Sequence, residues 1–290
     1  RDVGNYQIGP WFNWLTYNIQ EGTRVRFDLG TNRHFNKKLI LHGYLAYGFL
    51  DKEWKYQADA MYLFNRKPRT YISASWKRDF DRAQQYYDEI SQDNIFALAI
   101  RKNGVPIKFM MLDDKRVEFF RDTKIGLSTT ITAMHKKYDP VLNLPPKLLH
   151  ANGNGDSSVR ATEISVRLRY AYLEKFLENT FYRYSMGSEY PIVEVRYTAG
   201  LSGILKSRYS YHKLTGGISD YTDIPPLGTI YYNAFAGRTF GKQLPYMLLD
   251  IAPGNELYYY NRYAFNLMNR YEFLHDRYAG INIEHNFGNG

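Results

Sequence analysis

The segment from residue 159 to 174 alternates apolar and polar side chains with a period of two residues, which indicates a β-strand rather than a helix. At about a dozen residues it is longer than the usual strand of a soluble protein, which has roughly five or six. A tilted strand of about ten residues is enough to cross a bilayer. The segment therefore predicts a membrane-spanning strand with one face on lipid and the other on a wet lumen.

The same alternation recurs along the chain, and short polar turns at 51–53 and 65–68 are typical of hairpins in a meander. We expect about thirteen strands and no helix with a period of 3.6 residues. Besides the segment above, the predicted strands are 23–29, 39–50, 54–64, 71–77, 95–101, 107–120, 125–134, 193–197, 208–218, 228–238, and a last hairpin that pairs 265–273 with 278–287.

Polar or proline- and glycine-rich segments predict long loops at 79–94, 136–160 and 241–261. The first 22 residues are rich in aromatic side chains and turns, so they form either an interfacial anchor or a first strand. An up-and-down barrel should place its long loops at one end. The predicted long loops, however, follow both odd- and even-numbered strands, which would place them at both ends. Either a predicted boundary is wrong or a long loop folds inside the barrel.

Two sets of residues follow from the alternation. The apolar set, expected to face lipid, is Val25, Phe27, Leu29, Ile164, Val166, Leu168 and Tyr170. The charged set, expected to line the lumen as a network of cross-strand arginine–carboxylate contacts, is Arg24, Arg26, Asp28, Glu163, Arg167, Arg169, Glu194 and Arg196. Charges on a wet lumen cost little when counter-charges or water are near.

A soluble β-sandwich also alternates, with its apolar face in the core and its charged face in water. Three features favour the membrane: strands of about ten residues or more, tyrosine and tryptophan near strand ends, and meander connections without long crossovers. We therefore expect a single all-β domain over residues 1–290, an antiparallel transmembrane β-barrel of roughly 12 to 16 strands. Because the end of the chain is a poor final strand, the barrel is expected to be incompletely closed.

Composition agrees with this interpretation. The chain has 28 Tyr and 17 Phe, yet its mean hydropathy is −0.51, a combination that a barrel with a polar interior produces. The sequence has no apolar run of the length of a transmembrane helix. The formal charge of +9 is spread over most strands and interleaved with acids, which argues against nucleic acid as a partner. Cysteine is absent, so disulfides and thiolate metal sites are excluded.

The candidate chemistry is sparse. None of the seven histidines lies in a metal-ligand pattern, and we interpret His42, His212 and His285 as structural hydrogen-bonding residues. Ser210 and His212 lie on one strand face and are the best available pair for a barrel-embedded hydrolase. The run 152–156 has too few acidic residues for a calcium loop. We expect no catalytic residue, no metal site and no cofactor.

Several motifs resemble a large Gram-negative outer-membrane family of unknown function, whose members carry a carboxypeptidase-regulatory-like domain ahead of a membrane barrel. The resemblance runs over nearly the whole chain. The motifs are GPWFNWLTYN at 9–18, HGYLAYG at 42–48, YLFNRKP at 62–68, RYAYLEKF at 169–176, FYRYS at 181–185, YHKL at 211–214, PGNE at 253–256, YAFNLMN at 263–269 and IEHNF at 283–287.

This resemblance implies that the chain, which opens on Arg1, is the barrel portion alone, located in the bacterial outer membrane. It also implies a distant likeness to BamA-type and surface-antigen barrels, although their Arg-Gly-Phe or Arg-Gly-Tyr lumen motif is missing here. Our first hypothesis is a non-enzymatic barrel in envelope biogenesis, outer-membrane protein assembly or translocation. The alternatives are a structural or pore-forming barrel docked to a larger envelope complex, and a barrel-embedded hydrolase. The expected partners are outer-membrane lipid and other envelope proteins.

Overall fold

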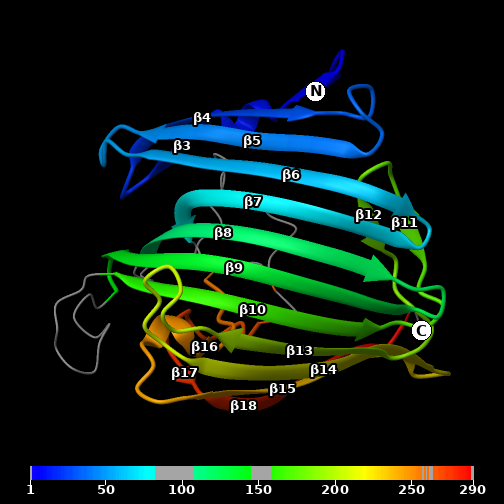
Figure 1. The fold of residues 1–290 in the computed structure, drawn as a ribbon. Coiled ribbons are helices and arrows are strands. Elements are labelled where there is room, and N and C mark those ends of the chain that lie inside the picture. Colours follow the sequence, from blue (N-terminus) through cyan, green and yellow to red (C-terminus); the bar gives the residue numbers. More distant parts are fainter. Residues whose placement is uncertain are drawn as a thin grey trace.

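A computed structural model describes residues 2–81, 108–144, 158–256, 258, 260 and 264–288. Its main feature is one antiparallel sheet of 14 strands, which curves into an open barrel (Figure 1). The prediction of an all-β antiparallel barrel of about that size is therefore confirmed. Within the described residues, no helix is long and apolar enough to cross a membrane.

The wall consists of long strands in chain order, each paired with the next. They are β4 (Gly22–Thr31), β5 (Leu39–Gly48), β6 (Trp54–Arg66), β7 (Arg69–Asp81), β8 (Phe109–Asp122), β9 (Leu127–Leu142), β10 (Val159–Tyr170), β13 (Ile192–Gly200), β14 (Tyr211–Ile224), β15 (Gly228–Gly241) and β18 (Arg277–Asn286).

Short elements complete the fold. They are β1 (Asp2–Val3), β2 (Tyr6–Ile8), the 3-10 turn η1 (Trp11–Asn13), β3 (Leu15–Asn18), β11 (Phe176–Glu178), β12 (Arg183–Ser185), the 3-10 turn η3 (Tyr246–Leu248), β16 (Asp250–Ile251) and β17 (Leu274–His275). The first three strands belong to the main sheet, whereas β11 pairs with β12 and β16 pairs with β17.

The predicted last hairpin is wrong. Strand β18 pairs with β15, with Ile283 opposite Tyr232, and the segment 265–273 is not a wall strand. Phe273 instead precedes the two-residue strand β17. A short turn signal at 274–276 suggested a local hairpin, but the ten-residue register with β15 offers a far longer ladder of backbone hydrogen bonds.

Two predicted loop boundaries are also corrected. The loop 136–160 was expected from its prolines, but β9 continues to Leu142 and places Pro140 within the strand, opposite Met110. Strand β7 is longer than the predicted 71–77 and takes in the start of the predicted loop 79–94. The remainder of that loop, the predicted strand 95–101 and the run 152–156 lie outside the described residues.

With the corrected boundaries most connections sort by length between the two ends, and the segment 171–191, which holds β11 and β12, is the long exception at the first of them. One end of the barrel, here called the short-turn end, carries the connections 32–38, 67–68, 123–126, 171–191 and 225–227. The other, the long-connection end, carries 49–53, 82–108, 143–158, 201–210 and 242–276. Four of the five connections at the second end span ten residues or more. In the register of the sheet, β2 begins beside Thr31 and β18 ends beside Thr229, so both termini of the chain lie toward the short-turn end.

The turn after β14 shows how glycine fixes this arrangement. Gly228 has φ +97°, a left-handed conformation that other residues rarely adopt. A Cβ at this position would collide with the backbone oxygen of Asn286, at the end of β18. Glycine therefore allows the β14–β15 turn to close tightly against the last strand.

Candidate functional site

The outward face of the wall is apolar along the middle of its strands. The seven residues predicted to face lipid are all on this face and expose between 36% and 54% of their surface. For example, Phe27 is 54% exposed and Val166 is 36% exposed. The seven lie on β4 and β10, and exposed apolar residues at outward positions of the strands between them, such as Leu45, Val117 and Ile131, continue the apolar band.

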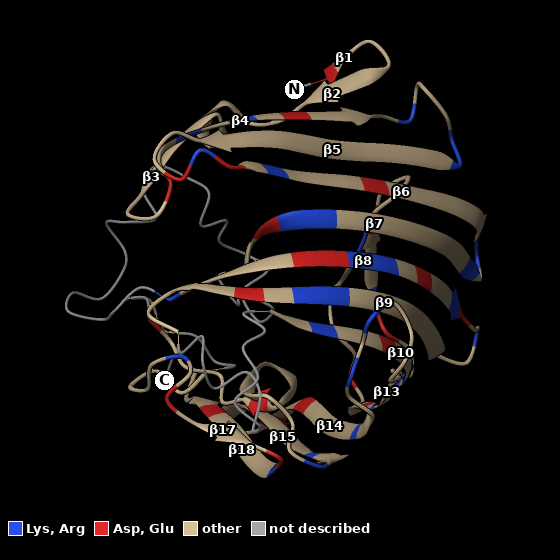
Figure 2. Ribbon diagram, turned by 60° about the vertical axis from the view of Figure 1, so that its left-hand side comes forward, with Lys and Arg blue, Asp and Glu red and all other residues tan. Residues whose placement is uncertain are grey.

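The inward face carries the charged residues. Arg24, Asp28 and Glu163 of the predicted lumen set are buried. Figure 2 shows that basic and acidic positions occur on neighbouring strands through the middle of the wall, notably on β7, β8 and β9. The three buried residues of the predicted set, Arg24, Asp28 and Glu163, include charges of both signs.

The most buried part of this face is a cluster of five charged residues at the long-connection end. Arg24 Nη2 lies 2.7 Å from Asp79 Oδ2 on β7, and Arg24 Nη1 lies 3.2 Å from Glu21 Oε1. Lys55 Nζ on β6 contacts the same Glu21 oxygen at 3.0 Å and pairs with Asp51. None of these five side chains is more than 9% exposed. We call these five residues the clamp.

The clamp joins the start of β4 to β6 and β7. Glu21 lies in the turn between β3 and β4, where Asn18 Oδ1 accepts the backbone N–H groups of Gln20 and Glu21. On the other side, the Tyr44 hydroxyl of β5 donates to Asp79 Oδ2 at 2.6 Å. Burying so many charges is unfavourable unless each has a partner, so the geometry of the first strands is closely specified.

The other predicted lumen residues form smaller groups. Arg26 Nη2 lies 2.5 Å from Asp28 Oδ1, and Arg167 Nη1 on β10 lies 3.9 Å from Glu194 Oε2 on β13. These groups are separate: the structure does not join the eight residues into one network. The remaining pairs are Arg196–Glu194 at 3.4 Å, Arg169–Glu174 at 2.6 Å and Lys136–Glu163 at 3.2 Å, and the Tyr211 hydroxyl also donates to Glu163.

Residues 242–256 and 264–276, here called the inner segment, pack against the inward face at the long-connection end. Met247 and Leu248 of η3 join a buried cluster with Val159 and Ala161 of β10 and Tyr211 of β14. Polar contacts also hold the inner segment. The Thr239 hydroxyl of β15 donates to Asp250 Oδ2 at 2.8 Å, Lys213 Nζ of β14 lies 3.7 Å from Asp250 Oδ1, and Lys108 Nζ donates to the Arg270 carbonyl at 2.6 Å. The inner segment therefore occupies part of the lumen. This agrees with the expectation that a long loop folds inside the barrel.

The two edges of the wall differ. The edge of β4 opposite β5 is covered by β2, with Gln7 opposite Gly30, and by β3, with Thr16 opposite Arg24. Strand β18 pairs with β15 on one side and has no strand on its other side within the described residues. The expected incomplete closure against the strand of Val25 is confirmed, because β4 and β18 are not neighbours in the sheet. We call the gap between these two edges the seam.

The three histidines of interest each have a hydrogen-bonding partner. His42 Nδ1 lies 3.3 Å from Asp59 Oδ2, and His285 Nε2 lies 2.8 Å from the Leu227 carbonyl. His212 Nδ1 lies 2.7 Å from the Tyr197 hydroxyl on the outward face, and Ser210 precedes β14. No group of three His, Asp or Glu side chains in the described ranges is arranged to hold a metal ion.

Sequence reasoning found Arg24 but missed its partners Glu21, Lys55 and Asp79. A signal existed for Lys55, which occupies a polar position in an alternating strand. Nothing in the spacing indicated Glu21, because it belongs to a turn, or Asp79, because the predicted strand ended before it. The role of Asp250 was also missed, since it lies in a segment without periodicity.

Comparisons with known proteins give the following. The model of the family described as "Family of unknown function (DUF5686) C-terminal domain" matches residues 124–289. A search of curated proteins gave no match. Among solved structures, the chain is similar to BamA from Haemophilus ducreyi lacking POTRA domains 1–3, with 10% sequence identity and a TM-score of 0.49. That similarity covers 88% of this chain and 45% of the BamA chain, so this chain spans less than half of that protein.

Proposed function

This chain belongs to the DUF5686 C-terminal domain family, whose function is unknown, and on that premise we propose that it is an outer-membrane barrel that takes part in envelope biogenesis by pairing with extended polypeptide at its seam. The proposed role is in outer-membrane protein assembly or translocation and needs no covalent chemistry. It depends on three properties: an apolar exterior, a defined orientation and an unpaired strand edge.

The exterior supports a location in the membrane. An exposed apolar band of this extent is far larger than the patches that soluble monomers tolerate. Aromatic residues on the outward face include Trp54 and Trp76 toward the long-connection end and Tyr62 and Tyr170 toward the other. Aromatic side chains at two levels are typical of the two interfaces of a bilayer.

The connections support an orientation. Outer-membrane barrels have short turns on the periplasmic side and longer loops outside the cell. Here four of the five connections at one end have seven residues or fewer, and four of the five at the other end have ten or more. We therefore assign the short-turn end to the periplasm.

The single observation that carries the proposal is the seam. An unpaired strand in hydrocarbon leaves backbone donors and acceptors without partners, which costs several kcal/mol for each group. Another extended segment can satisfy them by adding a strand, as in β-augmentation. Strand β18 has ten residues with one such edge, and its exposed Ile281 and Ile283 would flank an added strand on the lipid side.

A photo-reactive amino acid placed at Ile283 tests this proposal. Val166 is the matched control, because it is also outward-facing and apolar but lies in β10 between β9 and β13. We expect the probe at Ile283 to capture unfolded outer-membrane polypeptide in membranes that are assembling it, and the probe at Val166 to capture little. Equal capture at the two positions, or none at Ile283, would contradict the role of the seam.

The inner segment favours a second candidate, a structural barrel that does not conduct. Its apolar cluster and the Asp250 contacts occupy the lumen at the long-connection end. Asp250→Ala should then raise the single-channel conductance in planar bilayers above that of the wild type. A structural barrel predicts this result together with no polypeptide captured at Ile283, which distinguishes it from the assembly role.

A further inference from the structure

The outward face of β5 to β10 changes character in three successive levels. The first level is apolar and includes Ala74, Val117, Ala133 and Ile164, which are in register across β7 to β10. The next level, in register across the same strands, is Trp76, Lys115, His135 and Thr162, and the level beyond is Arg78, Asp113, Lys137 and Arg160. This change from apolar to charged marks the lipid headgroup level at the long-connection end.

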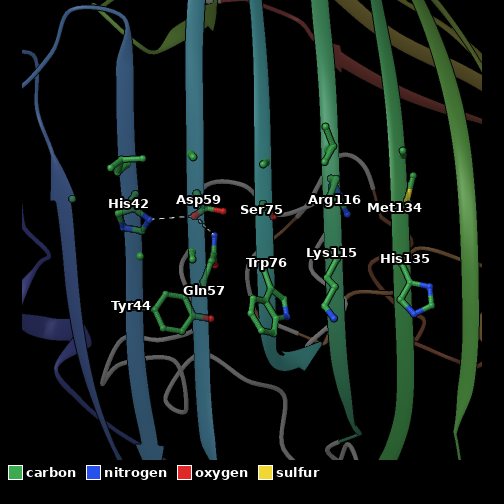
Figure 3. A pocket seen from close by; sticks show the side chains of 18 of the residues that line it. His42, Tyr44, Gln57, Asp59, Ser75, Trp76, Lys115, Arg116, Met134 and His135 are labelled. Carbon is green, nitrogen blue, oxygen red and sulfur yellow. Dashed lines mark hydrogen bonds and ion pairs between the residues drawn. The ribbon is translucent and has the colours of Figure 1, made fainter. Parts of the chain in front are cut away.

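Small side chains hollow the apolar level. The small residues at outward positions on three neighbouring strands are Gly43, Ala58, Ala60 and Ala74. The larger exposed side chains of Phe27 and Leu45 border them on one side. The result is an open depression of about 1160 Å³. Figure 3 shows its polar border, where Trp76, Lys115 and His135 lie beside one another on β7, β8 and β9. Lys115 Nζ lies 4.9 Å from the centre of the Trp76 ring.

The connection 201–210 forms the far border of the depression. The Leu201 N–H donates to the Thr162 carbonyl at 2.8 Å, and the Thr162 hydroxyl donates to the Ile204 carbonyl at 3.1 Å. These bonds hold the connection against β10. Ile204 and Leu205 line the depression and are 46% and 63% exposed. The connection therefore presents aliphatic side chains at the level where acyl chains would lie.

A second, polar cavity of about 290 Å³ is lined by the later residues of the same connection and by the start of β10. Arg160, Lys206 and Arg208 line it, and no carboxylate is among its described lining residues. Neither Arg160 nor Lys206 has an ion-pair partner in the part of the chain that the structure describes. The Ser207 hydroxyl also belongs to this lining; it is buried and has no hydrogen-bonding partner among the described residues.

We propose that these two neighbouring cavities form one site for a phosphorylated lipid of the outer leaflet, with acyl chains in the depression and a phosphate at Arg160, Lys206 and Ser207. A phosphate oxygen accepts hydrogen bonds from guanidinium, ammonium and hydroxyl groups, which satisfies the buried serine and the two cations together. Consecutive residues of the connection line the two cavities, because Ile204 and Leu205 line the depression and Lys206 and Ser207 line the polar cavity. A lipid whose headgroup lacks phosphate would leave the cations without a counter-ion.

The test uses the purified full-length protein, delipidated and reconstituted in detergent. Native mass spectrometry would measure binding of phosphatidic acid, of lipid A, of diacylglycerol and of inorganic phosphate. We expect both phosphorylated lipids to bind at least about tenfold more tightly than diacylglycerol, a difference of about 1.4 kcal/mol. Equal binding of diacylglycerol would overturn the phosphate part of the site, and phosphate that binds as well as the lipids would show an anion site only.

Variants separate the two cavities. R160Q/K206Q should weaken binding of the phosphorylated lipids about tenfold, whereas K37Q/K38Q, an equal loss of charge in the exposed connection at the short-turn end, should leave it unchanged. Ser207→Ala removes only a hydroxyl without a described partner, so the protein should still fold. It should bind the phosphorylated lipids more weakly than the wild type does. Ala60→Leu, which fills the depression, should weaken lipid binding but not phosphate binding. Wild-type lipid affinity in R160Q/K206Q and in S207A would refute the proposal.

Discussion

The two edges of the sheet are held in opposite ways. On the β4 side, two upstream strands cover the edge, and the clamp ties the β3–β4 turn to β6 and β7 through buried ion pairs. On the other side, β18 pairs with β15 alone among the described strands. The difference indicates a fixed edge and a free edge: the clamped strand defines the frame, and β18 is the edge available to a new partner.

The largest expected effect comes from breaking the clamp. Arg24→Ala leaves Asp79 buried without the cation that pairs with it and leaves Glu21 with Lys55 alone, which should lower the free energy of unfolding by about 3–5 kcal/mol. Urea titration of the barrel in lipid vesicles measures this loss. Arg196→Ala is the control, because its side chain is 48% exposed and its pair with Glu194 should contribute less than about 1 kcal/mol. Similar losses for the two variants would show that the clamp does not fix this edge.

A smaller effect tests which face of the wall meets lipid. Val166→Arg places a charge on the outward face and should cost about 2–4 kcal/mol near the bilayer midplane. Arg167→Val changes the neighbouring inward position and should mainly alter ion preference in the lumen. A membrane-folding assay compares the two variants. Equal tolerance would contradict the assignment of outward and inward faces.

A third change loosens the free edge alone. Gly228→Ala forces a side chain into a left-handed backbone and against the end of β18, with an expected cost of about 1–3 kcal/mol. Because the clamp is on the opposite edge, hydrogen exchange should rise in β15 and β18 but not in β4. Gly187→Ala is the control, since it has a similar φ of +90° but nothing within 4 Å of its Cβ. An equal rise in β4 would mean that the two edges are not independent.

The smallest effect concerns pH at the short-turn end. Burial opposes ionisation of Glu174, but hydrogen bonds from Arg169 and Ser185 and the charges of Arg169 and Arg183 hold its pKa below the ordinary 4.5. A carboxyl with a depressed folded pKa stabilises the fold above its unfolded pKa, and this stabilisation is lost as the pH falls through the folded value. Proteolysis of the β11–β12 hairpin should therefore increase below about pH 4.5 in the wild type. In Glu174→Gln it should be faster already at neutral pH and insensitive to acid; an unchanged pH profile would exclude this contact as the cause.

Period-two alternation was sufficient to predict wall strands such as β4 and β10, because each keeps one apolar face through its middle. It also places Val166 and Arg167 on opposite faces, since a one-residue step reverses the direction of the side chain in any strand. Pairing over long sequence distances was not predictable in this way. Strand β18 pairs with β15 across 35 intervening residues, and nothing local distinguishes that partner from a nearer one.

The candidate site was less predictable than the fold. The clamp depends on Glu21 in a turn and on Asp79 beyond the predicted end of a strand, so alternation could not identify them. The inner segment has no period because its contacts are irregular, from Met247 in the apolar cluster to Asp250 beside Lys213. The lipid site needs the connection 201–210 folded back on β10, which is a tertiary arrangement without a sequence motif.

Hydrogen exchange of the full-length protein in lipid nanodiscs tests the free edge most directly. We expect the amides of β18 that face away from β15 to exchange quickly, while β9, which is paired on both sides, is protected throughout. Addition of an unfolded outer-membrane polypeptide should then protect β18 and leave β9 unchanged. Complete protection of β18 before any polypeptide is added, or no change on addition, would contradict the claim that this edge accepts a strand.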